Sequence, residues 1–213
     1  IAITRSKLFG CYGVSLPYVN YGGPIGLADN VESTLIESAF SFVDRWALTH
    51  IEIRDTKSRP GFSTRNDKVC MYLDLEGVST FHDLQQLLPA KVRSQVKKAL
   101  GNGMSFQFGG IELLGDFYHV FAHHMRDLGT PVYGRELFAT ILQKFPDDAS
   151  LVIGYSGSAP VSCAFLLANG GEWEIPWAST LRAANRINAN MALYGWVLDY
   201  ILQKRGSSLD CGR

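Results

Sequence analysis

The pattern of apolar and polar positions is clearest near the C-terminal end of this 213-residue chain. Three runs rich in β-branched and aromatic residues are separated by short segments of glycine, serine and asparagine, which favour tight turns. Because each connection is only a few residues long, neighbouring runs are predicted to pair antiparallel. The three predicted strands are Ser150–Tyr155, Val161–Ala168 and Glu172–Ser179.

Other segments carry the helical period, in which apolar residues recur every three or four positions. Asp29 or Asn30 is a candidate N-cap of the first helix, and Pro89 suits the first turn of a later one. The predicted helices are Val31–Leu48, Pro89–Leu100, Leu114–Leu128, a helix marked by Leu137, Phe138, Ile141 and Leu142, and Asn190–Lys204, with a further helical turn from Ser79 or Thr80. The remaining predicted strands are Ile1–Phe9, Val14–Asn20, His50–Arg54, Val69–Leu75, Met104–Phe108 and Ser208–Cys211. This order predicts an α/β (α+β) fold with a mixed, mostly antiparallel sheet flanked by helices on both faces.

A strand that meets a proline, a polar loop, a helix and a short strand occurs twice. Glu174–Ser179 matches Ser15–Asn20 in residue character, and the offset between Pro17 and Pro176 is 176 − 17 = 159. The same offset places Leu35, Ala39, Phe42 and Val43 on Tyr194, Leu198, Ile201 and Leu202, and Arg54 on Arg213. We interpret this match as an internal repeat; two unrelated strand–loop–helix units are the alternative.

The polar stretch around Pro60-Gly61 is the best candidate for a linker. We therefore divide the chain into residues 1–56, a linker at 57–67 and a second domain at 68–213. By the offset of 159, Ile1 corresponds to Pro160, which lies well inside the second domain. We expect residues 1–56 to be the C-terminal part of a truncated first domain, and the chain to be a fragment with weak or no activity.

Charge and cysteine content limit the classes of function. The 20 Lys and Arg residues balance the 20 Asp and Glu residues, which argues against binding DNA through bulk electrostatics. The four cysteines show no paired metal-ligand spacing and suit buried thiols in a reducing compartment. No apolar run approaches the ~20 residues that a membrane-spanning helix needs. We expect a cytoplasmic protein; the sequence does not indicate its oligomeric state.

Pro176 is the most informative single residue. Proline offers no N–H to a sheet, so a central strand that contains it must part from a neighbouring strand there. The parted strands would expose unpaired backbone groups in a cleft, which can hold an acyl or peptide group. An edge strand that tolerates a proline is the alternative, and the second copy at Pro17 favours the parted strand.

Polar residues crowd the loop that follows this strand. Arg182 and Arg186 precede a helix N-terminus at Asn190, where guanidinium and backbone N–H groups can bind an anion. A solvated capping loop is the alternative. Positions 182–190 contain no glycine, so the chain lacks a Gly-rich phosphate-binding loop there.

Two further patterns have ordinary structural alternatives. Lys91, Arg93, Lys97 and Lys98 border the apolar face of one helix, where they would bind phosphate or RNA or simply extend past a buried stripe into solvent. His119 and His123 have the i, i+4 spacing of a metal-binding pair, but no third ligand is near in sequence, which favours a solvent-exposed face. Spacing identifies no nucleophile and no general base.

Six motifs distributed along the chain can be considered together: Leu16–Gly23, His50–Arg54, Lys91–Ala99, His124–Pro131, Asn188–Tyr194 and Leu209–Arg213. They resemble the FemAB-related proteins, in particular the branch associated with PEP-CTERM/exosortase and exopolysaccharide systems. The resemblance covers nearly the whole chain, and it implies two tandem acetyltransferase-like (GNAT) domains, in agreement with the internal repeat.

The resemblance implies transfer of an acyl or aminoacyl group to an amine. Fem proteins take amino acids from aminoacyl-tRNA and transfer them to an amine of a peptidoglycan precursor. For this chain we expect aminoacyl-tRNA as donor, an amine-bearing envelope or exopolysaccharide precursor as acceptor, and no metal or tightly bound cofactor. The expected substrate-binding residues are Pro176, Trp177, Arg182, Arg186, Asn190, Tyr194, Tyr133, Arg126 and Arg213, with Tyr133 or Tyr194 lining the cleft or relaying a proton.

Two alternatives stay open from the sequence. A CoA-dependent N-acetyltransferase would use acetyl-CoA as donor, against which stands the missing Gly-rich loop after Pro176. A non-catalytic interaction module in an envelope or polysaccharide assembly system is compatible with the lack of a clear catalytic residue.

Overall fold

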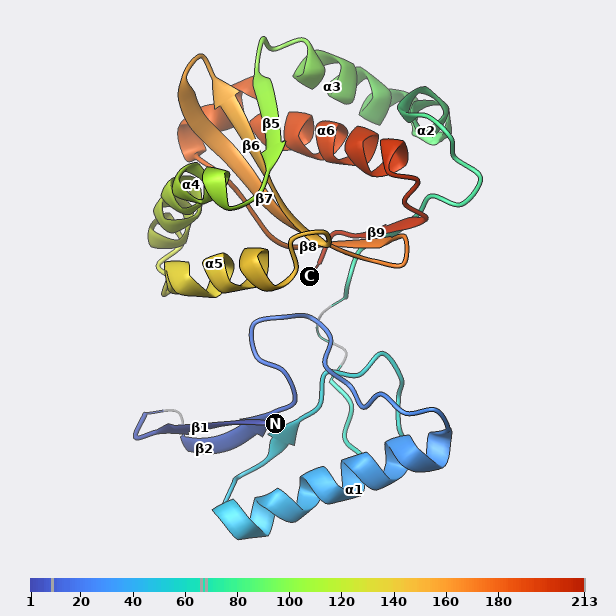
Figure 1. Ribbon diagram of the computed structural model, residues 1–213, viewed down its shortest axis with the longest axis vertical. Coiled ribbons are helices and arrows are strands. Elements are labelled where there is room, and N and C mark those ends of the chain that lie inside the picture. The colour runs from blue at the N-terminus through green and yellow to red at the C-terminus, as the bar shows by residue number, and fades with distance from the viewer. Residues whose placement is uncertain (9, 66, 68, 213) are drawn as a thin grey trace. The chain divides into compact units, whose positions relative to one another are not determined.

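The computed structural model describes residues 1–8, 10–65, 67 and 69–212 (Figure 1). The chain forms two compact units, Ile1–Val69 and Cys70–Gly212, which we call the N-terminal unit and the C-terminal unit. Each unit combines strands with helices, as the sequence predicts.

The C-terminal unit is built on a six-stranded sheet with the strand order β4-β9-β8-β7-β6-β5 in its described part. Neighbouring strands are antiparallel except β8 and β9, which run parallel. The strands are β4 (Tyr72–Asp74), β5 (Ser105–Gly109), β6 (Ala149–Ser156), β7 (Ala159–Asn169), β8 (Glu172–Thr180) and β9 (Ser208–Asp210). The helices are α2 (Phe81–Leu87), α3 (Ala90–Leu100), α4 (Leu114–Asp127), α5 (Arg135–Lys144) and α6 (Ala189–Gln203), with 3₁₀ turns η1 (Ile111–Leu113) and η2 (Arg182–Ile187).

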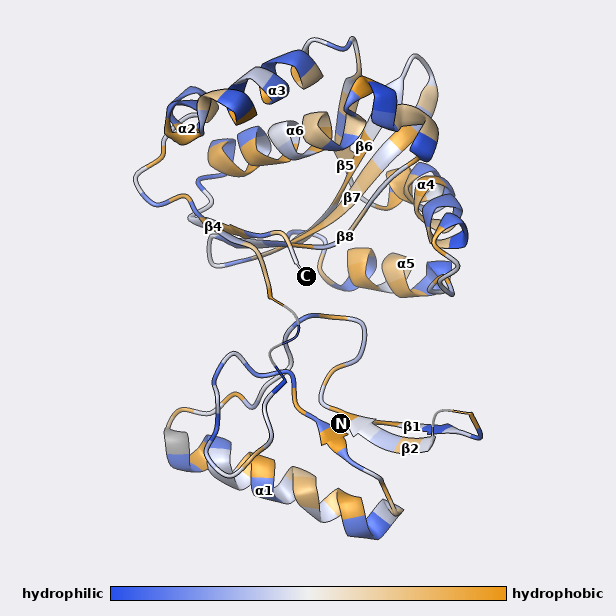
Figure 2. Ribbon diagram, turned by 180° about the vertical axis from the view of Figure 1, so that it is seen from behind, coloured by the Kyte–Doolittle hydropathy of each residue, from blue (hydrophilic) through white to orange (hydrophobic). Residues whose placement is uncertain are grey.

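Both faces of this sheet are covered by helices, so its central strands alternate between two apolar layers. On one face, Phe165 of β7 and Trp177 of β8 pack with buried residues of α4 and α5. On the other face, Leu166 and Ile175 pack with α2 and α6. Figure 2 shows the resulting concentration of apolar residues along the central strands and on the helix faces turned toward them. The predicted mixed sheet with helices on both faces is confirmed.

The starts of α2 and α3 lie at the residues that the sequence marks as helix starts. Thr80 caps α2 in a capping box, in which its hydroxyl accepts from the Asp83 N–H and the Asp83 carboxylate accepts from the Thr80 N–H. Pro89 is the N-cap of α3. Arg93 of α3 donates to the backbone carbonyls of Gln86 and Leu88 at distances of 3.3 and 3.2 Å, so it stabilises the end of α2. Arg93 therefore has a structural role at the junction of α2 and α3.

The N-terminal unit contains a three-stranded sheet and one long helix. Strands β1 (Ala2–Ser6) and β2 (Gly10–Val14) pair antiparallel, α1 (Asp29–Trp46) follows, and β3 (Ile51–Glu52) then pairs parallel with β2. The series β7, β8, α6 and β9 has the same connectivity and the same strand directions. The internal repeat predicted from the sequence is therefore confirmed as a repeat of topology.

Several predicted details of the N-terminal unit are wrong. The hairpin turn includes Lys7 and Leu8, and Pro17 lies in a turn after β2 instead of in a strand, because β2 ends at Val14. The N-cap of α1 is Ala28, without a side-chain cap hydrogen bond, so neither Asp29 nor Asn30 has that place. The helical period predicts a buried stripe on this helix that contains Leu35, Ile36 and Trp46; Ile36 is buried, but Leu35 and Trp46 are exposed.

An ion cluster attaches the start of the predicted linker to α1. Arg59 forms an ion pair with Glu32 at 2.9 Å and another with Asp55, and the Lys57 ammonium lies 3.1 Å from the Glu32 carboxylate. Hydrogen bonds from Arg59 and then Lys57 lower the pKa of Glu32. Burial acts to raise the pKa of Asp55. The hydrogen bonds that its carboxylate accepts from Arg59 and from nearby backbone N–H groups outweigh this effect, so the pKa is lowered.

These lowered pKa values predict that the N-terminal unit loses stability in acid. A carboxyl group whose pKa is lower in the folded state contributes stability above its unfolded-state pKa, and this contribution is lost as the pH falls through the folded-state value. We expect the amides of α1 to exchange hydrogen faster, relative to intrinsic rates, as the pH is lowered from 6 toward about 3. In Glu32→Gln this dependence should weaken, whereas Glu37→Gln, on the exposed surface of the same helix, should retain it. Identical pH profiles for the two variants would refute the assignment.

Candidate functional site

The candidate site lies where β8 parts from β9. In the described residues their ladder contains three pairs, Glu172↔Ser208, Trp173↔Leu209 and Glu174↔Asp210, and the part of β8 that follows Glu174 has no β9 partner. Pro176 is the second residue after the last ladder pair, at the place where the sequence predicts the strands to separate. On its other edge β8 stays paired with β7, with a bulge opposite Phe165–Leu167.

The N-terminus of α6 follows the parted strand through η2. Asn188 precedes the helix in a left-handed conformation, with φ of 54°, and makes no side-chain cap hydrogen bond. The first N–H groups of an α-helix lack intrahelical acceptors, and the helix dipole adds partial positive charge there. The parted edge of β8 and this uncapped helix end therefore supply backbone N–H groups for a carbonyl or an anion.

The polar residues predicted to bind substrate differ in their surroundings. Arg182 donates a hydrogen bond of 3.0 Å to the backbone carbonyl of Asp127, so it joins η2 to the end of α4. Arg186 and Asn190 are exposed near the start of α6. Arg126 is exposed at the end of α4, with its guanidinium 3.9 Å from the Asp127 carboxylate. Arg213 lies outside the described residues.

The aromatic residues predicted to line the cleft lie on opposite faces of the sheet. Trp177 is buried, and its ring is 6.3 Å from that of Tyr133 in an edge contact, within the layer formed by α4 and α5. Tyr194 of α6 packs in the other layer, where burial, and then the charge of Cys211, raises the pKa of its phenol. Tyr194 therefore keeps its proton at neutral pH and can donate a hydrogen bond. The structure does not bring Tyr133 and Tyr194 together.

Unpartnered polar groups near the parted strand escaped the sequence analysis. Among the described residues, the hydroxyls of Ser162, Ser179, Thr180 and Ser208 and Nδ1 of His124 are buried without a hydrogen-bond partner. Ser162 and Thr180 are register partners and, by strand alternation, face the α6 layer. Such orphan groups are uncommon in folded proteins and mark places where a ligand or water can bind. Small polar residues within an apolar strand were the available signal, but their burial depends on the helix that covers them and could not be predicted from the strand alone.

Other sequence candidates gain no support as sites. The rings of His119 and His123 meet edge to face at 4.5 Å, and the described residues contain no group of three or more potential metal ligands. The four cysteines are free; Cys163 is buried, which raises the pKa of its thiol, whereas Cys11, Cys70 and Cys211 are only partly buried. Within the residues described, no helix combines the length and apolar character needed to cross a bilayer.

Comparison with solved structures identifies the fold. FemX matches 99% of this chain and 74% of its own length with a TM-score of 0.64 and 12% sequence identity. L-PGS from Bacillus licheniformis matches 86% of this chain and 58% of its own length with a TM-score of 0.58 and 15% identity. The ribosomal-protein-S18-alanine N-acetyltransferase from Escherichia coli matches 49% of this chain and 62% of its own length, with a TM-score of 0.41 and 14% identity.

At these identities the comparison establishes the fold alone. The chain has a FemAB/GNAT-like fold of the acyltransferase type, shared with FemX and L-PGS. No protein-family model matches the sequence, and no curated protein matches it.

Proposed function

We propose that this chain forms part of an enzyme that transfers an aminoacyl or acyl group to an amine. The observation that carries the proposal is the parting of β8 from β9 after Glu174, followed by the uncapped N-terminus of α6. The fold shared with FemX and L-PGS supports the same reaction type.

In this proposal the acceptor amine attacks the donor carbonyl directly. The new C–N bond forms first and gives a tetrahedral intermediate with its negative charge on the carbonyl oxygen. The intermediate then collapses as the bond to the leaving oxygen or sulfur breaks, and the amine proton passes to solvent or to the leaving group. Unpaired N–H groups of β8 would stabilise the oxyanion of the tetrahedral intermediate. No covalent enzyme intermediate is required.

The donor phosphates would bind near the start of α6. Arg186 and Asn190 are exposed there, beside the free N–H groups of the first helical turn. Arg182 is already hydrogen-bonded to α4, so its proposed role is to hold η2 in place as well as to contribute charge.

We propose aminoacyl-tRNA as the donor and an amine of an envelope or exopolysaccharide precursor as the acceptor, following the FemAB-related sequence motifs. Exposed Lys91, Lys97 and Lys98 on α3 supply positive charge suited to an RNA backbone. Acetyl-CoA is the competing donor, and the uncapped α6 N-terminus would suit its pyrophosphate as well.

Donor binding distinguishes these possibilities. Thermal unfolding is measured with acetyl-CoA, deacylated tRNA or aminoacyl-tRNA; a donor present at about 100 times its Kd stabilises the folded state by about 2.7 kcal/mol. We expect stabilisation by aminoacyl-tRNA. A response to acetyl-CoA alone would assign the N-acetyltransferase reaction, and no response to any donor would contradict the proposal.

Thr180→Val tests whether the orphan hydroxyl serves the donor. Removing a buried hydroxyl without a partner is expected to stabilise the free protein by about 1 kcal/mol and to weaken donor binding roughly 3- to 10-fold. Ser208→Ala is the matched control, because Ser208 is also buried and unpartnered but lies in the paired part of the β8–β9 ladder. It should change stability without changing donor affinity. Equal donor affinity in wild type and Thr180→Val would remove Thr180 from the site.

A further inference from the structure

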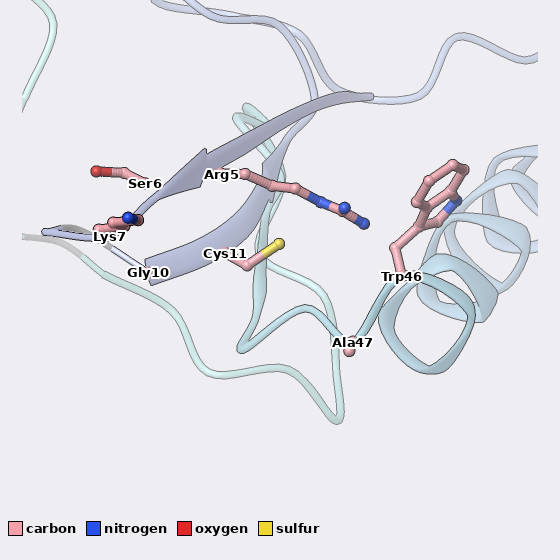
Figure 3. A pocket seen from close by; sticks show the side chains of 7 residues that line it. All are labelled: Arg5, Ser6, Lys7, Gly10, Cys11, Trp46 and Ala47. Atoms are coloured by element: carbon pink, nitrogen blue, oxygen red, sulfur yellow. The ribbon is translucent and has the colours of Figure 1, made fainter.

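A pocket in the N-terminal unit has no part in the proposed transfer site. It lies between the end of the β1–β2 hairpin and the C-terminal end of α1, and its volume is about 570 Å³ (Figure 3). The pocket is wide open to solvent. The pocket is lined by Arg5, Ser6, Lys7, Gly10, Cys11, Trp46 and Ala47.

The wall of the pocket contains a cation held against an aromatic ring. Arg5 and Cys11 are register partners on β1 and β2, so their side chains share one face of the hairpin. The Arg5 side chain extends toward Trp46 in Figure 3, and its guanidinium carbon lies 5.4 Å from the centre of the Trp46 ring. Cation–π contact orients the guanidinium without using up its N–H donors.

The positive charge of the pocket is not neutralised by the described residues. Arg5 and Lys7 both line it, and neither forms an ion pair or a side-chain hydrogen bond with another described residue. At the nearby end of α1, the Ala47 and Leu48 N–H groups bond to the carbonyls of Asp44 and Val43. Two cations therefore face an open space without a counter-charge.

We propose that this pocket binds a small-molecule oxyanion, a phosphate or carboxylate group. The guanidinium fork of Arg5 would bind two oxygens of the anion, and Lys7 would supply a second charge. Trp46 would form one wall of the site and contact any apolar part of the ligand.

Pyrophosphate and citrate are suitable probes for a binding experiment on the full chain. Binding is measured calorimetrically at constant ionic strength, with sodium chloride as the reference, together with the change in tryptophan fluorescence. Trp46→Phe identifies the part of that change which comes from the pocket. We expect saturable binding of at least one probe, with a fluorescence change that Trp46→Phe abolishes.

Substitutions separate this pocket from the proposed donor site. Arg5→Gln and Lys7→Gln should each weaken binding about 10-fold, which corresponds to about 1.4 kcal/mol. Lys98→Gln in the C-terminal unit removes one positive charge, as the two pocket variants do, and should leave probe binding unchanged. Thr180→Val should also leave probe binding unchanged. Unchanged binding in Arg5→Gln, or a loss in Thr180→Val alone, would overturn the proposal and leave the proposed transfer function standing.

Discussion

Replacing Phe117 with alanine is expected to lower the free energy of unfolding of the C-terminal unit by about 3–5 kcal/mol. Its side chain is 0% exposed, and its ring centre lies 5.6, 5.0 and 5.8 Å from those of Phe121, Phe138 and Phe165. These neighbours come from α4, α5 and β7, so the ring joins two helices to the sheet. Because three elements fix the walls, the cavity left by the substitution cannot collapse easily.

The measurement is equilibrium unfolding in urea, followed by circular dichroism. Phe145→Ala is the matched control, because it removes the same atoms from a side chain that is 54% exposed. The control should change stability by about 0.5 kcal/mol or less. Similar losses in the two variants would show that Phe117 does not have the central place in packing that we assign to it.

Gly154→Ala is expected to destabilise the same unit by about 2–3 kcal/mol through overpacking. A Cβ at this position would lie 2.3 Å from the Ser162 hydroxyl oxygen and 2.6 Å from Phe106 Cε1. Ser162 is fully buried, and the Phe106 ring stacks on Trp196 with a centroid distance of 5.6 Å, so neither can move away freely. Glycine is therefore required at position 154 because neighbouring side chains approach closely, and not because of an unusual backbone angle.

Gly101→Ala is the control for the general effect of a Gly-to-Ala change. Gly101 follows α3 with φ of −82°, and a Cβ there would meet its nearest heavy atom, a backbone oxygen, at 3.5 Å. Its stability should be unchanged or slightly increased, because alanine restricts the unfolded chain. Thermal unfolding of Gly154→Ala and Gly101→Ala compares the two effects. If Gly154→Ala were as stable as the wild type, the Ser162 and Phe106 side chains would have to rearrange at little cost.

The elements of the C-terminal unit could be predicted because several local signals agree. Its central strands are apolar runs bounded by turn residues, and its helices α2 and α3 have starts marked by Thr80 and Pro89. Each strand of the meander is also buried on both faces, so the apolar run is long enough to be recognised. Here the local preference and the tertiary environment favour the same structure.

In the N-terminal unit, glycine misled the prediction of the hairpin. The predicted strands Ile1–Phe9 and Val14–Asn20 leave Gly10–Gly13 for the turn between them, but these residues lie in β2. A Cβ at Gly13 would come within 3.1 Å of the Ile1 and Ile51 side chains. Glycine is therefore needed here for packing and not to form a turn. Glycine permits both, and only the packing of distant segments distinguishes them.

By itself the sequence determined the class of fold and the internal repeat, because these depend on local periodicity, and it singled out Pro176 through the missing N–H of proline. Only the tertiary structure decided which side chains share the site. It placed Tyr133 and Tyr194 in opposite layers, joined Arg182 to the end of α4, and left the Thr180 hydroxyl buried without a partner. Those outcomes depend on strand register and on the helix that covers each face, which are fixed by contacts between segments far apart in the chain.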